Sequence, residues 1–192
     1  MLKNRKRNFA IFMLPSVLIL IVVLAVPLIY SLVVSFFDTN LKSSGLGNFV
    51  GLQNYLSALT DSYFLGSMGT TFIFTAGVVC VEFAVGLGIA LLLNSNVTGK
   101  NIYFSIILVP MMITPVAVGL IWRLLLHSEL GIVNYLLEQI GISGQAWLAD
   151  SSLALKTVMF IDVWQNVPYM VLVILAGLVS LPGEPYEAAR VD

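Results

Sequence analysis

The sequence predicts an all-α integral membrane protein with four transmembrane helices. Of its 192 residues, 59% are hydrophobic and 10% are charged, whereas soluble domains carry about 25% charged residues. Such a composition cannot cover a water-exposed surface, and the mean hydropathy of +0.98 agrees with this. Four apolar segments exceed the roughly 20 helical residues that cross the hydrocarbon core; they lie at about residues 9–37, 68–93, 102–126 and 153–181.

The first segment follows a cluster of basic residues, which sets its orientation. The cluster consists of Lys3, Arg5, Lys6 and Arg7, and basic residues favour the cytoplasmic side of a membrane. We therefore expect a multi-pass protein with a cytoplasmic amino terminus. The apolar segment far exceeds the roughly 7–15 residues of a signal-peptide core, so we expect it to be retained as a span.

Alternating crossings place segments 38–67 and 127–152 outside the membrane, and each is predicted to contain a short helix. The first pattern follows Gly51-Leu52-Gln53-Asn54-Tyr55 and ends near Leu59. In the second, between residues 131 and 140, apolar residues recur at the spacing of a helix with one apolar face. We expect both helices to lie on the outer membrane surface.

The second segment contains the chain's most costly intramembrane residue, Glu82. A carboxylate at the bilayer centre costs roughly 2.5–3.5 kcal/mol on insertion scales, so Glu82 is expected to face other helices. No ionisable neighbour is evident from sequence, which favours a gating or packing role over ion coupling. Small residues recur nearby and favour close helix packing: Ala84, Gly86, Gly88 and Ala90.

Polar residues interrupt the middle of the fourth segment. Spacings of three and four predict one shared helix face, which carries Asp162, Gln165, Asn166 and Tyr169. Pro168 has no N–H to donate, so the helix can bend there. Amides and aromatic rings suit a polyhydroxylated ligand. The alternative, to which we give equal weight, is hydrogen bonding between helices, at about 1 kcal/mol per contact.

The end of the chain resembles the EAA signature of membrane permeases in ATP-binding-cassette importers. The segment Glu187-Ala188-Ala189-Arg190-Val191-Asp192 follows Leu181-Pro182, and the chain ends one residue before the expected glycine. Other short motifs match carbohydrate-importer permeases in the same order: Pro27-Leu28-Ile29-Tyr30, Gly51-Leu52-Gln53-Asn54-Tyr55, Val109-Pro110, Trp147-Leu148-Ala149-Asp150 and Pro168-Tyr169. We therefore expect residues 1–192 to form a single transmembrane permease domain whose carboxy-terminal part is missing.

This resemblance implies a location in the inner (cytoplasmic) membrane and a set of partners. Two ATPase subunits would contact a cytoplasmic coupling helix that starts near the end of the chain. The resemblance implies that five residues of this helix make the contact: Glu187, Ala188, Ala189, Arg190 and Asp192. A second permease subunit and an extracytoplasmic solute-binding protein complete the expected assembly. In the fourth segment, the resemblance and the chemistry together give four candidates for substrate contact: Gln165, Asn166, Tyr169 and Trp164.

The sequence shows no pattern for catalysis, a metal or another cofactor, and no nucleic-acid partner is expected. His127 is the one histidine and Cys80 the one cysteine. The stretch Thr98-Gly99-Lys100-Asn101 resembles the end of a phosphate-binding loop but lacks the first glycine and the hydroxyl residue after lysine. Two alternatives stay open beside a sugar or polyol importer: a permease for amino acids or peptides, and a four-span scaffold without transport activity.

Overall fold

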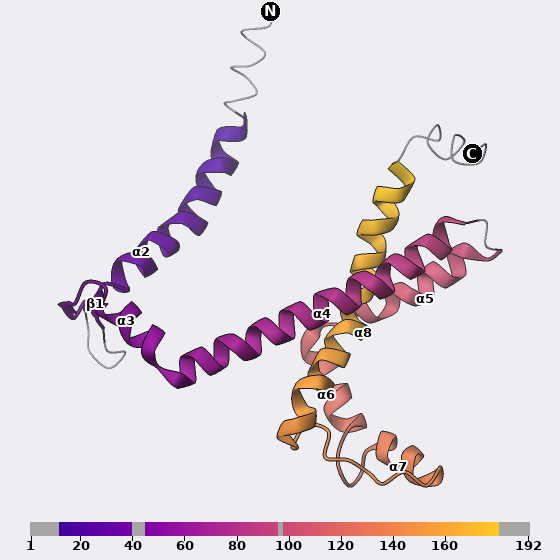
Figure 1. The fold of residues 1–192 in the computed structure, drawn as a ribbon. Coiled ribbons are helices and arrows are strands. Elements are labelled where there is room, and N and C mark those ends of the chain that lie inside the picture. The colour runs from indigo at the N-terminus through magenta and orange to yellow at the C-terminus, as the bar shows by residue number, and fades with distance from the viewer. Residues whose placement is uncertain (1–11, 40–44, 96–97, 181–192) are drawn as a thin grey trace, which may run out of the picture. The chain divides into compact units, whose positions relative to one another are not determined.

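The computed structural model describes residues 12–39, 45–95 and 98–180, most of which are helical (Figure 1). The chain divides into two compact units, Met1–Gly69 and Thr70–Asp192. The predicted coupling segment and the basic amino-terminal cluster lie outside the described residues. The all-α prediction is confirmed, and the one strand pair among the described residues is two residues long on each side.

The first unit begins with a helical candidate span, Phe12–Val34, which is long and apolar enough to cross a membrane. It contains a π-helical turn, η1 (Ile21–Ala25), followed by α2 (Val26–Val34). Pro27 lies in the first turn of α2 and cannot donate to the helical ladder, and the widened π turn lies immediately before it. At its other end, the helix stops at Val34, three residues before the predicted boundary at residue 37.

A small polar cluster joins the end of α2 to the next helix. Strands β1 (Phe37–Asp38) and β2 (Asn48–Phe49) pair antiparallel, and α3 (Gln53–Thr60) confirms the predicted first short helix. The Asn54 amide donates to the backbone carbonyls of Ser35 and Phe37, at 2.9 and 3.0 Å. The Ser35 and Tyr55 hydroxyls are also hydrogen-bonded, at 2.6 Å. These bonds fix the turn that follows the first candidate span.

Two long helices, α4 (Ser62–Asn94) and α8 (Ser151–Ser180), are candidate spans by length and hydropathy. With 33 and 30 residues, they extend about 50 and 45 Å at a rise of 1.5 Å per residue. Both lengths exceed the hydrocarbon core of about 30 Å, which favours tilt or extension into the headgroups. Between them, α7 (Ile132–Gln139) confirms the second predicted short helix.

The predicted third span, 102–126, is not one straight helix. It consists of α5 (Lys100–Met112) and α6 (Pro115–Leu125), which bend by 92° at the break between them. Thr114, directly before Pro115, has extended backbone angles (φ −63°, ψ 142°), because a following proline disfavours the helical region. The described residues thus contain three helices able to cross a membrane, or four spans if the bent pair counts as one.

The core of the second unit lies where α4 and α5 pack on α8. A stripe of α4 residues at helical spacing is buried: Val78, Glu82, Gly86, Ala90 and Leu93. Ala90 and Leu93 contact Val167 and Val171 of α8, with Phe104 and Ile107 of α5 packed against them. Of the predicted stripe of small residues, Gly86 and Ala90 face this core, whereas Ala84 and Gly88 are exposed.

Gly86 lies at a close approach of α4 to α8, which generates a first prediction. A Cβ atom at Gly86 would lie 2.7 Å from Met170 Cγ and 3.5 Å from the Met170 backbone carbon, whereas one at Gly88 would meet no heavy atom within 4 Å. Gly86→Val should therefore destabilise the full-length protein by about 1–3 kcal/mol through overpacking. Thermal unfolding in lipid nanodiscs measures this loss.

Gly88→Val is the matched control, because it has the same helix propensity cost without the steric conflict. It should unfold within a degree or two of the parent protein. Equal losses in both variants would show that the close approach at Gly86 does not limit stability.

Candidate functional site

The polar residues at the centre of α8 do not act as one face. Gln165 is half-buried, and its Nε2 donates to the Ile113 carbonyl at the α5–α6 break, 3.2 Å away. Asp162 is half-buried, while Asn166 and Tyr169 are exposed. The helix stays continuous through Pro168. The structure therefore separates one amide that binds another helix from two side chains that point away from the described core.

Trp164 lies in an aromatic cluster between α6 and α8. Its ring meets that of Trp122 edge-on, with centroids 5.4 Å apart, and Trp122 meets Phe160 in the same way at 5.6 Å. Such edge-to-face pairs add about 0.5–1.5 kcal/mol to the burial energy. The indole Nε1 of Trp122 is buried without a hydrogen-bond partner within the described chain. Trp164 thus already uses one edge of its ring to hold α6 against α8.

Glu82 faces other helices, with only 8% of its surface exposed. Its Oε1 atom is buried and has no hydrogen-bond partner among the described residues. Sequence reasoning found no ionisable neighbour, but Asp162 of α8 lies close enough to interact with Glu82 electrostatically. Two acidic side chains from different helices, Glu82 of α4 and Asp162 of α8, therefore lie within electrostatic range of each other. Whether Glu82 serves gating or packing stays a prediction.

Sequence reasoning missed a buried asparagine that organises the segment between α6 and α8. Asn134 is 3% exposed. Its amide nitrogen donates to the carbonyls of Ser128 and Gln145, and its oxygen accepts from the Gln145 N–H and Trp147 Nε1, all at 2.7–3.1 Å. An amide in the apolar pattern of a short helix was the available signal, because such a group needs partners when buried.

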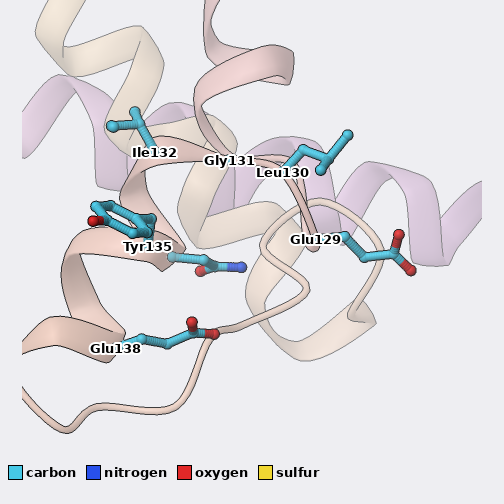
Figure 2. Close-up of a pocket in the computed structure, with 7 residues that line it drawn as sticks. Glu129, Leu130, Gly131, Ile132, Tyr135 and Glu138 are labelled. Atoms are coloured by element: carbon cyan, nitrogen blue, oxygen red, sulfur yellow. The ribbon is translucent and has the colours of Figure 1, made fainter.

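A pocket of about 320 Å³ lies along the start of α7, beside Asn134. Figure 2 shows Tyr135 and Glu138 on one side of this pocket and Glu129 on the loop before α7. The predicted orientation puts this pocket on the outer side of the membrane, and that placement stays a prediction. Its rim carries two carboxyl groups, from Glu129 and Glu138.

Asp150 closes the same segment by capping the first turn of α8. Its carboxylate accepts from the Ser152 hydroxyl and the Ser152 N–H, each at 2.7 Å. These hydrogen bonds hold the pKa of Asp150 below its ordinary value, because they stabilise the charged form. Trp147 and Asp150 of the motif Trp147-Leu148-Ala149-Asp150 thus both have local structural roles.

Among the described residues, no group of three or more histidine, cysteine and acidic side chains could hold a metal ion. We take as the candidate site the polar centre of α8 together with the helix break that Gln165 contacts.

Curated relatives identify the family. Over 182 residues the chain is 39% identical to the probable ABC transporter permease y4oQ of Sinorhizobium fredii, covering 94% of this chain and 59% of the relative. The chain belongs to the permeases of ATP-binding-cassette transporters. This permease is also 35% identical over 144 residues to the trehalose/maltose transport permease MalF of Thermococcus litoralis, covering 75% of this chain and 49% of the relative. No family model matches the sequence.

Solved structures show the same fold. The permease aligns along its whole length with 64% of a chain in the crystal structure of a bacterial alginate ABC transporter in complex with an alginate pentasaccharide-bound periplasmic protein. The TM-score is 0.80 at 20% identity. The permease thus spans between about half and two thirds of the length of these proteins, and its expected single-domain organisation stays a prediction.

The Asn134 cluster generates a second prediction. Asn134→Ala removes four hydrogen bonds and takes this partner from the Ser128 carbonyl, the Gln145 backbone and the Trp147 indole, so the segment between α6 and α8 should lose about 2–4 kcal/mol of local stability. Hydrogen exchange of the Gln145 amide in the full-length permease should accelerate accordingly.

Gln145→Ala serves as the control, because the Gln145 side chain donates only to the nearby Ser143 carbonyl. Exchange of the backbone amide at residue 145 in that variant should stay within about three-fold of the parent rate, because one exposed hydrogen bond contributes little. Unchanged exchange in Asn134→Ala would show that the cluster is not what orders this segment.

Proposed function

We propose that the protein is a transmembrane subunit of an ATP-driven importer that carries a sugar or polyol across the cytoplasmic membrane. The similarity to permeases over 94% of the chain carries this proposal. Relatives whose names state a cargo include permeases for trehalose/maltose, sulfoquinovosyl glycerol and sn-glycerol-3-phosphate. These names favour a polyhydroxylated cargo over an amino acid or a peptide, and transport over a scaffold role.

In this proposal the polar centre of α8 contacts the substrate. Asn166 and Tyr169 are exposed, and their side chains make no hydrogen bonds within the described chain. A carboxamide donates and accepts, which suits sugar hydroxyls, and a tyrosine ring supplies an apolar face. Gln165 keeps its amide oxygen available as an acceptor, and Trp164 offers the part of its ring that Trp122 does not cover.

The partners follow from the same family membership. A solute-binding protein delivers the substrate to the outer face, where the segment between α6 and α8 is stiffened by Asn134. A second permease subunit completes the pathway. ATP hydrolysis takes place on separate ATPase subunits, which contact the coupling residues Glu187, Ala188, Ala189, Arg190 and Asp192. The amino terminus is cytoplasmic, in keeping with its basic residues.

Asn166→Leu tests the substrate-contact proposal. The variant should lower the rate of sugar uptake by the full-length importer about ten-fold, the effect of one or two net hydrogen bonds. Co-purification of the ATPase subunits should not change. Asn101→Leu, which replaces an exposed asparagine at the start of α5, is the matched control and should transport normally. Normal uptake kinetics in Asn166→Leu would favour a packing role for Asn166.

Glu187→Lys tests the coupling proposal. Reversing this charge should reduce ATPase co-purification at least about five-fold through the loss of a charge-assisted contact, while membrane insertion stays intact. Glu184→Lys makes the same charge change three residues earlier, outside the EAA segment, and should have a smaller effect. Equal complex yields and uptake in the parent and Glu187→Lys would remove the coupling role.

A further inference from the structure

The break between α5 and α6 leaves the backbone short of hydrogen bonds inside a predicted span. Ile113 ends α5 in an extended conformation (ψ 134°), and Pro115, at the start of α6, has no N–H to donate. Lipid supplies no donors, so a carbonyl exposed at such a break needs a protein partner. The Nε2 group of Gln165 supplies it at the Ile113 carbonyl, across 52 positions of sequence.

The contacts of α8 lie on both sides of this hydrogen bond. Toward the amino-terminal end, Trp164 and Phe160 of α8 hold Trp122 of α6. Toward the carboxy-terminal end, α8 residues after Gln165 form the core cluster against which α5 packs Phe104 and Ile107. The two arms of the bent pair therefore rest on successive parts of one continuous helix, and Gln165 binds the point where they meet.

The chemistry of the amide fixes which atom binds the break. A backbone carbonyl only accepts, so the NH₂ end of Gln165 must face Ile113 and the amide oxygen must face away. That oxygen accepts no hydrogen bond from the described residues. Asn166, the next residue along α8, is exposed and is the proposed substrate contact. A ligand bound to Asn166 therefore lies next to Gln165, whose side chain is hydrogen-bonded to the break between α5 and α6.

We propose that Gln165 is a positioning residue that sets the angle between α5 and α6 and couples this angle to substrate occupancy on α8. The second part of this inference, the coupling to substrate, rests on the proposed transport function. The first part, control of the angle, depends only on the hydrogen bond to Ile113. With the bond made, the bent pair is held in one geometry. With it broken, each arm is held only by its own contacts with α8, and the angle at residues 113–114 varies over a wider range.

The decisive variant is Gln165→Met, which keeps the length and flexibility of the side chain and removes the donor. Gln165→His is the matched control, because an imidazole N–H restores a donor at similar reach. Both are made in full-length permease assembled with its partner subunits in lipid nanodiscs. Spin labels at Ile106→Cys on α5 and Leu124→Cys on α6 report the angle, since both positions are exposed; the native Cys80, also exposed, is first replaced by serine.

The expected result is a narrow label-to-label distance distribution in the parent and in Gln165→His, and a distribution at least about twice as broad in Gln165→Met. ATP hydrolysis without sugar should rise about five-fold in Gln165→Met, the population shift that one net hydrogen bond supports. A merely structural role would not raise this uncoupled activity. Identical distributions in the parent and Gln165→Met overturn the inference, as does a broad distribution in Gln165→His.

The coupling half has its own readout. Trehalose, used as the probe sugar with the solute-binding protein present, should shift the parent distribution and leave that of Gln165→Met unchanged. A broadened Gln165→Met distribution together with no uptake of any sugar or polyol by the parent would refute the proposed function and leave the control of the angle intact. Sugar uptake with an unshifted parent distribution would refute the coupling alone.

Discussion

The arrangement of α5, α6 and α8 depends on the hydrogen bond from the Gln165 side chain to the Ile113 carbonyl. A bilayer interior gives no partner to a backbone carbonyl, so a helix that breaks there must be completed by another helix. Here α8 completes the broken pair, and it does so from the middle of its own length. The packing of α5 and α6 on either side of Gln165 makes α8 the common support of the second unit.

The contact between α4 and α8 depends on a different property, the absence of a side chain at Gly86. Without a Cβ at that position the helices approach closely enough for Ala90 and Leu93 to reach Val167 and Val171. The same stripe of α4 carries Glu82 into the seam, beside Asp162. The buried face of α4 thus carries both the apolar packing residues and Glu82. A shift of α4 along α8 would therefore change the surroundings of the Glu82 and Asp162 carboxyl groups.

The helices could be predicted from the sequence, but the contacts between them could not. Length and hydropathy located three of the four predicted segments to within several residues, because a lipid-exposed helix must be long and apolar. The third prediction was wrong in form: Pro110 and Pro115 were visible, but hydropathy alone does not detect a bend. The partner of Gln165 and the four bonds of Asn134 depend on residues that meet only after folding. The two-residue strand pair is too short to leave a periodic pattern.

Trp147 and Asp150 have a consequence for how this family is recognised. The indole of Trp147 binds Asn134, and the carboxylate of Asp150 caps α8, so this motif is explained by local architecture. Neither residue needs a role in substrate recognition to account for its position. Sequence comparisons that rely on Trp147 and Asp150 will therefore group proteins by fold and will not distinguish their cargo. By contrast, no hydrogen bond within the described residues involves the side chains of Asn166 and Tyr169, which are exposed on α8 and stay the proposed positions for cargo recognition.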